Sequence, residues 1–163
     1  MCEVTAVLPE NYEESEAPRA DSAQALFAAI FFAVWAADSF WLHWTTHYSQ
    51  QVSSIIRTTL FILLTLLGGY LSWASHKQIF GVARQEAELV DYGVFRLSRH
   101  PMYLGIMMIY LGLTLSSMSV AALVVLAVIF LFYNYLASYE EAKLIENFGE
   151  KYYNYSKRVR RWL

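Results

Sequence analysis

Charged side chains are scarce in this chain of 163 residues, at 16% of the total, whereas soluble domains carry about 25%. Cysteine occurs once, as Cys2, which excludes an internal disulfide and a zinc site built from cysteines. The formal net charge of -2 lacks a basic excess, so no nucleic-acid partner is expected. Hydrophobic residues make up 57% of the chain and aromatic residues 17%. This composition indicates a protein embedded in a membrane.

Four long hydrophobic segments account for this composition. They span residues 23–42, 55–74, 102–117 and 120–137. A membrane-spanning helix needs about 20 apolar residues, so the first two segments are long enough and the last two are slightly short. A short polar turn at 116–119 makes an antiparallel hairpin of the last two. We therefore expect an all-α, polytopic membrane protein with about four transmembrane helices, a cytoplasmic connector and an amphipathic C-terminal helix.

These segments divide the chain into three regions. Residues 1–22 are acidic and should form a disordered tail; they lack the positive start of a signal peptide, so no cleavage is expected. Residues 23–74 should form two N-terminal transmembrane helices. In the second of these, Gly68 and Gly69 would allow close packing against a neighbouring helix. Residues 75–163 contain the connector, the hairpin and the C-terminal helix.

Three polar residues near the end of the first hydrophobic segment are open to two interpretations. Asp38 could reach water at the membrane interface or act as an inward-facing functional acid, and the interfacial position is favoured. His43 and His47 are four residues apart, so on a helix they would share a face that could hold a metal ion. No third ligand is evident nearby, so an interfacial role is favoured and no metal site is expected.

Basic residues concentrate in two parts of the chain. Four lie in the connector, residues 75–100, and six in the tail that begins at Lys143, whereas the first loop holds only Arg57. Basic residues favour the cytoplasmic side, so the connector, both termini and the functional face should be cytoplasmic. The last basic cluster would contact anionic lipid headgroups. It consists of Lys157, Arg158, Arg160 and Arg161.

The stretch from Gly93 to Gly105 joins the charged connector to the third hydrophobic segment. Pro101 lacks a backbone N–H and has a fixed φ, so it suits the first turn of a helix and disfavours helical geometry at His100. Arg99 and His100 should therefore lie just outside a helix start, near its free N–H groups and the positive end of its dipole. This arrangement is suited to holding an anion.

A second ionic group, Glu140-Glu141, follows the fourth hydrophobic segment. Because the third and fourth segments form a hairpin, these glutamates should lie near Arg99 and His100 on the same side of the membrane. Such a cluster could bind a zwitterionic ligand, with its carboxylate toward the helix start and its ammonium or hydroxyls toward the glutamates. An interfacial salt-bridge network would use the same residues, and the spacing alone leaves both interpretations open.

Two separated motifs resemble the isoprenylcysteine carboxyl methyltransferase family. The first comprises Leu89-Val90, Gly93, Arg96 and Arg99-His100-Pro101-Met102-Tyr103-Leu104-Gly105, and the second comprises Glu140-Glu141, Leu144, Phe148-Gly149, Tyr152 and Tyr155. That family belongs to a wider group of membrane methyltransferases that includes the phospholipid N-methyltransferases. The resemblance covers residues 89–161, nearly half of the chain.

The resemblance implies methyl transfer from S-adenosylmethionine to a lipid-like acceptor at the membrane face, with residues 75–163 as the catalytic region. The implied cofactor contacts are His100, Tyr103, Glu140 and Glu141, with Leu89, Val90 and Gly93 lining the pocket. Arg99 would hold the acceptor's carboxylate, so Arg99 and Glu140 are the candidate catalytic residues. The favoured reaction is carboxyl O-methylation of a prenylated cysteine or a similar isoprenoid. A carboxylate is already ionised at neutral pH, so it needs orientation rather than a general base.

The sequence leaves three alternatives to this reaction open. A phospholipid amine N-methyltransferase would need His100 or a carboxylate to accept a proton from the amine. An NADPH-dependent sterol-type reductase would share the Arg-His-Pro-x-Tyr segment, and a four-span membrane scaffold would need no cofactor. The chain departs from the family in having no basic residue at 136–139, just before Glu140. This departure leaves the acceptor open among a prenylated cysteine, an isoprenoid thiol or acid, a phospholipid amine and a small xenobiotic.

Overall fold

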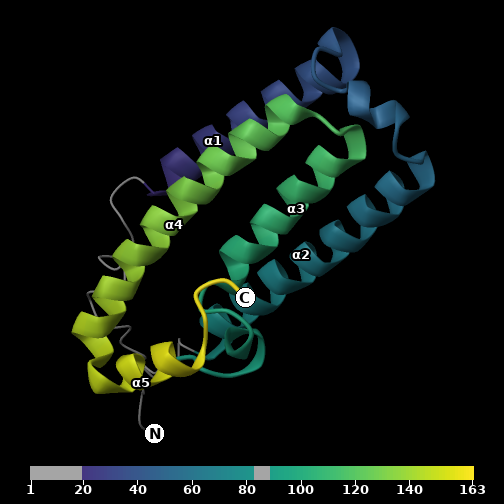
Figure 1. Cartoon of the computed structure of the whole chain (residues 1–163). Helices are drawn as coiled ribbons and strands as arrows, with labels where there is room; N and C mark the ends of the chain where they lie inside the picture. Colours follow the sequence, from purple (N-terminus) through teal and green to yellow (C-terminus); the bar gives the residue numbers. More distant parts are fainter. Residues whose placement is uncertain (1–19, 83–88) are drawn as a thin grey trace, which may run out of the picture.

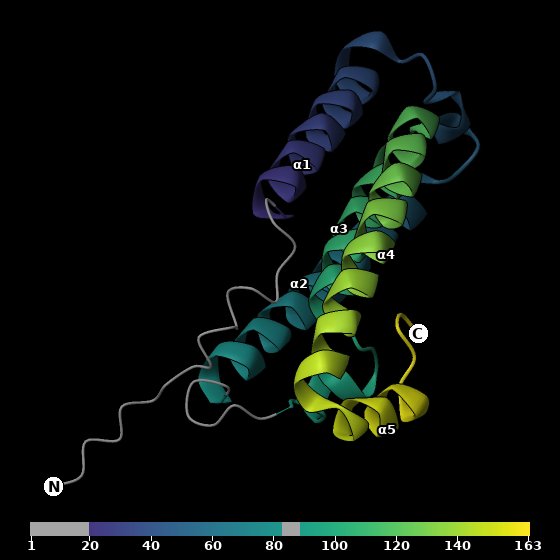
Figure 2. The same ribbon diagram turned by 90° about the vertical axis from the view of Figure 1, so that its left-hand side faces the viewer.

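A computed structural model describes residues 20–82 and 89–163, and within these ranges the chain is helical with no strand (Figure 1). The long helices α1 to α4 alternate in direction along the chain (Figures 1 and 2). The elements are α1 (Ala20–Ala36), the π-helical turn η2 (Ala37–Leu42), the 3-10 turn η3 (His47–Gln50), α2 (Ser54–Val82), the 3-10 turn η4 (Gly93–Arg96), α3 (Pro101–Ser117), α4 (Val120–Phe148) and α5 (Glu150–Arg158).

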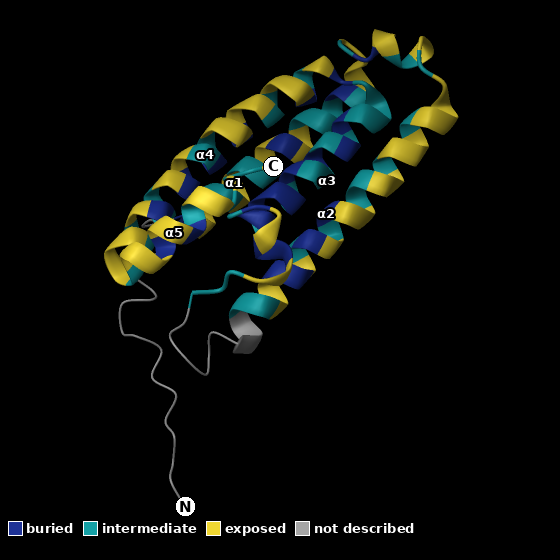
Figure 3. Ribbon diagram, turned by 60° about the horizontal axis from the view of Figure 1, so that its bottom comes forward, coloured by how far each residue is buried: buried dark blue, intermediate teal, exposed yellow. Residues whose placement is uncertain are grey.

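Three helical segments are long and apolar enough to cross a membrane: Ala20–Leu42, Ser54–Ile79 and Val120–Phe148. Helix α3 is apolar but has 17 residues, slightly fewer than the roughly 20 that a span needs. Much of the outward surface of these helices is exposed and apolar (Figure 3), as expected for side chains that face lipid instead of water. The prediction of an all-α, polytopic membrane protein is confirmed.

Two helices extend beyond their predicted limits. Helix α1 begins at Ala20, three residues before the predicted start, with Asp21 in its first turn, where a negative charge favours the helix dipole. Helix α2 continues to Val82, so the predicted division between residues 74 and 75 falls inside a helix. No glycine or proline interrupts residues 75–80, and the polar residues there lengthen the helix beyond its apolar part. The predicted acidic tail lies mostly outside the described residues, as does part of the connector, at 83–88.

Helices α2 and α3 cross closely at a pair of glycines. A Cβ atom on Gly105 would lie 2.5 Å from the backbone oxygen of Gly68, and a Cβ atom on Gly68 would collide with the backbone oxygen of Gly105. Small residues permit such an approach between helices in a membrane, so the close packing predicted at Gly68 is confirmed. A Cβ atom on Gly69 would meet nothing within 4 Å, so the same prediction is wrong for Gly69, which faces away from α3.

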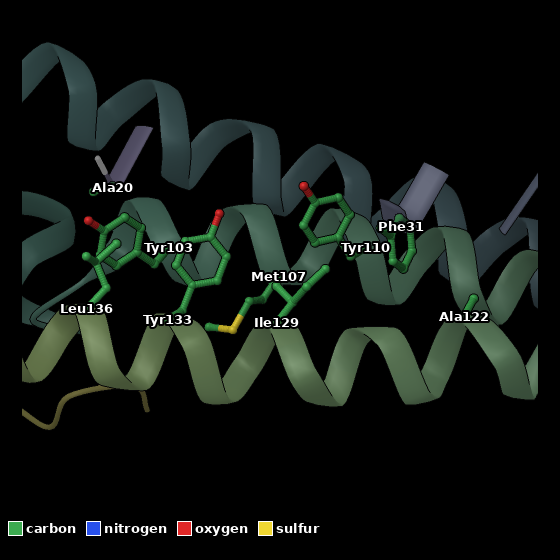
Figure 4. Close-up of a cluster of buried hydrophobic side chains, with 9 residues drawn as sticks. All are labelled: Ala20, Phe31, Tyr103, Met107, Tyr110, Ala122, Ile129, Tyr133 and Leu136. Atoms are coloured by element: carbon green, nitrogen blue, oxygen red, sulfur yellow. The ribbon is translucent and has the colours of Figure 1, made fainter. Parts of the chain in front are cut away.

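The hairpin of α3 and α4 is packed around a row of aromatic side chains (Figure 4). Tyr103 and Tyr133 stack with ring centroids 4.9 Å apart. Phe31 of α1 lies 4.4 Å from the ring of Tyr110, which joins the first helix to the hairpin. These contacts hold α3 against α4 and therefore set the relative positions of the N-terminal end of α3 and the C-terminal half of α4.

Asp38 lies at the opposite end of the hairpin from His100. Its side chain is only 3% exposed and accepts hydrogen bonds from the hydroxyls of Thr45 and Ser119, each at 2.5 Å, and from the backbone N–H of Thr45 at 3.0 Å. The favoured interpretation of Asp38 as an interfacial, water-exposed acid is therefore wrong. Its carboxylate links the loop after α1 to the turn between α3 and α4.

His43 and His47 do not share a helical face. Helix η2 ends at Leu42, His43 has a φ of +50°, and η3 begins at His47. The helix is interrupted by a bend between the two residues, so the spacing of four does not place them on one helical face. Within residues 20–82 and 89–163, no group of three or more His, Cys, Asp or Glu side chains is arranged to hold a metal ion.

Candidate functional site

The end of the hairpin opposite Asp38 gathers η4, the start of α3, the polar end of α4, α5 and the C-terminal segment (Figures 1 and 2). Pro101 is the first residue of α3, and His100 precedes it with φ -126° and ψ 62°, outside helical geometry. The predicted helix start at Pro101 is confirmed. The backbone N–H of His100 donates to the Ser98 hydroxyl at 3.2 Å, which fixes the imidazole just before the helix.

The imidazole of His100 lies between two consecutive glutamates of α4. His100 Nδ1 is 3.4 Å from Glu140 Oε2, and His100 Nε2 is 3.0 Å from Glu141 Oε1. The hydroxyl of Tyr103, one turn into α3, donates to Glu140 Oε1. The predicted convergence of the two ionic motifs is therefore confirmed, although they are about 40 residues apart and only the hairpin brings them together.

The environment of His100 favours its protonated form. Burial acts to lower the pKa of the imidazole, but hydrogen bonds and charge from Glu140 and Glu141 outweigh burial and raise the pKa above its ordinary value of 6.5. Both ring nitrogens therefore act as donors to carboxylates in the imidazolium form. His100 is thus part of an ion-pair cluster in which the two glutamates favour the imidazolium over the neutral ring.

Arg99 adds a second cation to this cluster. Its Nη1 lies 3.4 Å from Glu141 Oε2, while its buried Nε has no hydrogen-bond partner among the described residues. The neighbouring Tyr152 is also buried, and burial, with the charge of Glu141, raises the pKa of its phenol to about 12. Tyr152 therefore stays protonated beside Arg99, and the Arg99 Nε is a buried donor without a hydrogen-bond partner in the described part of the chain.

Arg161 completes the cluster and was missed as a site residue from the sequence. Its Nε donates to Glu141 Oε1 at 2.9 Å and its Nη2 to Glu141 Oε2 at 2.8 Å. The basic tail predicts that Arg161 contacts lipid headgroups, and for this residue the prediction is wrong, because its guanidinium pairs with Glu141. A chain terminus that returns to a site leaves no spacing signal in the sequence, although Arg161 does follow the Tyr152 and Tyr155 motif closely.

The C-terminal segment is anchored by its backbone as well. The Arg99 N–H donates to the carbonyl of Arg160 at 3.0 Å, and the Ser98 hydroxyl donates to the carbonyl of Arg161 at 2.7 Å. Trp162 lies with its ring centroid 6.0 Å from that of His100. The segment after α5 is therefore held against the site, beside the ion pairs of His100.

The predicted pocket-lining residues Leu89, Val90 and Gly93 lie toward the end of α2. Val90 packs against the second buried cluster, which includes Val94 and Phe95. Gly93 has a φ of +61°, and a Cβ atom there would collide with the amide of Gln78. The positive φ favours glycine at position 93, and a larger residue there would also require the Gln78 side chain to move. The role of these three residues toward a cofactor stays a prediction.

Comparisons with known proteins agree with this geometry. The family model described as phospholipid methyltransferase matches residues 52–151, which include His100, Glu140 and Glu141. The chain belongs to this family. A methanethiol S-methyltransferase from Pseudomonas deceptionensis is 32% identical over 147 residues, which cover 82% of this chain and 50% of that protein. No solved structure matches.

Membership of the phospholipid methyltransferase family confirms the resemblance to the wider group of membrane methyltransferases. The comparisons favour that group over the sterol-type reductases and the non-enzymatic scaffolds. The chain spans half the length of the curated relative. Arg161 lies beyond the residues that the family model matches, so only the structure associates it with the site.

Proposed function

We propose that this membrane methyltransferase uses S-adenosylmethionine to methylate the thiol of a small or lipid-soluble acceptor. The observation that carries the thiol is the likeness to a methanethiol S-methyltransferase across most of the chain. When bound, S-adenosylmethionine would supply the methyl group of its positively charged sulfur. Transfer of that methyl group to the acceptor's thiolate would give a thioether and S-adenosylhomocysteine, and the thiol's proton would pass to solvent.

The residues present fit S-adenosylmethionine. The cofactor carries a carboxylate, an ammonium group and ribose hydroxyls, and the cluster offers a donor from Arg99 and an acceptor from Glu140. Two further polar atoms, Ser75 Oγ and Gln78 Oε1, are buried without a hydrogen-bond partner among the described residues. Gln78 lies beside Gly93, one of the predicted pocket-lining residues; since buried polar atoms are nearly always paired, its unpartnered oxygen is consistent with a polar ligand there.

The side chains of the site orient the acceptor and exclude water. Arg99, with its unpartnered Nε, would stabilise a thiolate over a thiol, since a nearby cation lowers a thiol's pKa from about 8.5. His100 is already held as a donor to two carboxylates and is not needed as a base. Trp162 lies beside the buried imidazole, and the exclusion of water from such a site strengthens these charge interactions.

Carboxyl O-methylation of a prenylated cysteine is the second candidate. It is favoured by the same unpartnered Arg99 Nε. A guanidinium with an unpaired N–H group can bind a carboxylate through two parallel hydrogen bonds. We also propose, as the distribution of basic residues indicates, that the site faces the cytoplasm.

Methyl-label transfer decides between the acceptors. Purified protein in lipid vesicles would receive S-adenosylmethionine with a labelled methyl group and, in parallel, methanethiol, S-farnesylcysteine or phosphatidylethanolamine. Label in dimethyl sulfide would support the thiol. Label in the farnesylcysteine ester, with none in dimethyl sulfide, would establish the second candidate and overturn the first. Label only in the phospholipid, or in none of the three, would overturn both.

A further inference from the structure

Glu141 has used nearly all of its capacity to accept hydrogen bonds within the protein. Its Oε1 meets His100 Nε2 at 3.0 Å and Arg161 Nε at 2.9 Å. Its Oε2 meets Arg161 Nη2 at 2.8 Å and Arg99 Nη1 at 3.4 Å. A carboxylate has about four acceptor sites, and the side chain of Glu141 is only 10% exposed. Glu141 therefore has little left with which to contact a ligand.

Glu140 is less occupied than its neighbour. It accepts from the Tyr103 hydroxyl and lies 3.4 Å from His100 Nδ1, and its side chain is 22% exposed. No arginine is paired with it among the described residues. Of two adjacent glutamates that the sequence treats alike, Glu140 keeps acceptor capacity and access, whereas Glu141 is enclosed by cations.

The guanidinium of Arg161 is held in a fixed orientation. Besides its two bonds to Glu141, its Nη1 donates to Asn134 Oδ1 at 3.1 Å and to Ser138 Oγ at 3.0 Å. The carbonyl of the same residue accepts from Ser98 at 2.7 Å. Arg161 is thus bound at both its side chain and its backbone, and its planar fork fixes the plane of the Glu141 carboxylate.

We infer that Arg161 is a positioning residue, which holds Glu141 so that Glu141 orients His100 and leaves Glu140 as the carboxylate that contacts the methyl donor. This inference rests on the proposed use of S-adenosylmethionine. It assigns different tasks to the two glutamates: Glu141 belongs to the support of the site, and Glu140 belongs to its binding surface.

Binding of S-adenosylhomocysteine, measured by calorimetry in detergent, tests the coupling of Arg161 to Glu141. Arg161→Gln and Glu141→Gln should each weaken binding by about tenfold, as contacting residues in one ion-pair network do. The double variant should bind S-adenosylhomocysteine no more weakly than the single variant with the lower affinity, because each of the two changes removes the same Arg161–Glu141 interaction. Arg161→Lys should recover only part of the affinity, since lysine lacks the fork. Arg158→Gln, at an exposed pair with Asp91, is the matched control and should bind as the unchanged protein does.

The protonation of His100 gives a readout that does not depend on a ligand. The charged and titratable groups around it are Glu140 and Glu141 from α4, Arg161 from the C-terminal segment, Arg99 beside it, Tyr103 from α3 and Tyr152 from α5. If Arg161 positions Glu141, then Arg161→Gln frees that carboxylate to turn away, and the pKa of His100, followed by NMR, should fall. If Arg161 acted only through its charge, its removal should raise that pKa.

These measurements separate the inference from the proposed function. Failure of the unchanged protein to bind S-adenosylhomocysteine would overturn the use of S-adenosylmethionine, while the NMR titration would still report on Arg161. The inference itself is overturned if the pKa of His100 is unchanged or higher in Arg161→Gln, or if the losses of the two single variants multiply in the double variant. Should Arg161→Gln fail to fold, Arg161→Lys is titrated in its place with the same expected direction.

Discussion

Glu140 and Glu141 are neighbours in the chain whose side chains do different things. Successive residues on an α-helix point about 100° apart, so Glu140 turns toward Tyr103 while Glu141 turns toward Arg161 and the C-terminal segment. His100 contacts both of them and holds the pair together. The proposed chemistry of the site therefore depends on which of the two glutamates can still accept a hydrogen bond from a ligand.

Glu140→Gln should weaken donor binding, whereas Arg99→Ala should mainly slow turnover. The first change removes the charge of the accessible carboxylate, and we expect about a tenfold loss in affinity for S-adenosylhomocysteine. The second removes the cation proposed to orient the acceptor, and we expect a lower kcat with little change in donor affinity. Glu146→Gln, at an exposed pair with Lys143, is the control for losing a glutamate on α4. Normal binding and turnover in both site variants would contradict these assignments.

The protein should become less stable as the pH rises above neutrality. Burial lowers the pKa of His100 but the two glutamates raise it above the unfolded value of 6.5. The stabilisation from the imidazolium is therefore fully present below about pH 6.5 and is lost as the pH rises through the folded pKa. Thermal unfolding in detergent between pH 6 and pH 9 would show a falling midpoint. His100→Gln should flatten this dependence, and an equally steep fall in that variant would assign the effect to another group.

At the scale of elements, the α2–α3 pair supports the site. The start of α3 carries His100 and Tyr103, and its position depends on the contact between Gly68 and Gly105. A second small residue, Gly112, meets the α2 backbone near Phe61 on the same face of α3, two turns further along. Close contact along two turns fixes α3 against α2. An added side chain at this contact would therefore shift the start of α3, next to the imidazole of His100.

Gly68→Ala should destabilise the protein and Gly69→Ala should not. A methyl group at Gly68 collides with the backbone of Gly105, and such overpacking costs about 1–3 kcal/mol. A methyl group at Gly69 meets nothing within 4 Å, and alanine favours helix by about 0.8–1 kcal/mol over glycine. Denaturation of the two variants in the same detergent is the measurement. Equal stabilities would show that α2 and α3 are not in close contact at Gly68.

At the scale of the whole molecule, the two ends of the hairpin differ in kind. One end holds the ion pairs of His100, the glutamates and the arginines. The other holds Asp38, which bonds to Thr45 and Ser119 and links two loops. The membrane lies between them if the apolar helices cross it, so a site at one end can be reached from only one aqueous compartment.

Cysteine labelling should place the two ends on opposite sides of the membrane. With Cys2, the single cysteine of the sequence, replaced by alanine, a cysteine at exposed Glu150 and one at exposed Gln50 provide a probe for each end. In intact cells, an impermeant maleimide should label the cysteine at position 50 and spare the one at position 150, because basic residues favour the cytoplasm. Labelling of both positions from outside would contradict the proposed orientation.

The features of this protein that follow from local rules could be predicted from its residues alone. Apolar runs determined the membrane helices, Pro101 determined the start of α3, and the short turn before Val120 made the hairpin that joins His100 to the glutamates. Each of these follows from segment length, backbone geometry or a short connection, and none requires knowledge of a distant residue.

The partners of residues that are remote in the chain depend on how the helices pack, and they could not be predicted. In the folded chain Asp38 is buried, Gly68 contacts α3 whereas Gly69 does not, and Arg161 pairs with Glu141. A charge near a helix end or in a basic tail looks the same in the sequence whether it meets water, lipid or a buried partner. The difference lies in which helix face is covered and where the chain returns, and packing alone determines both.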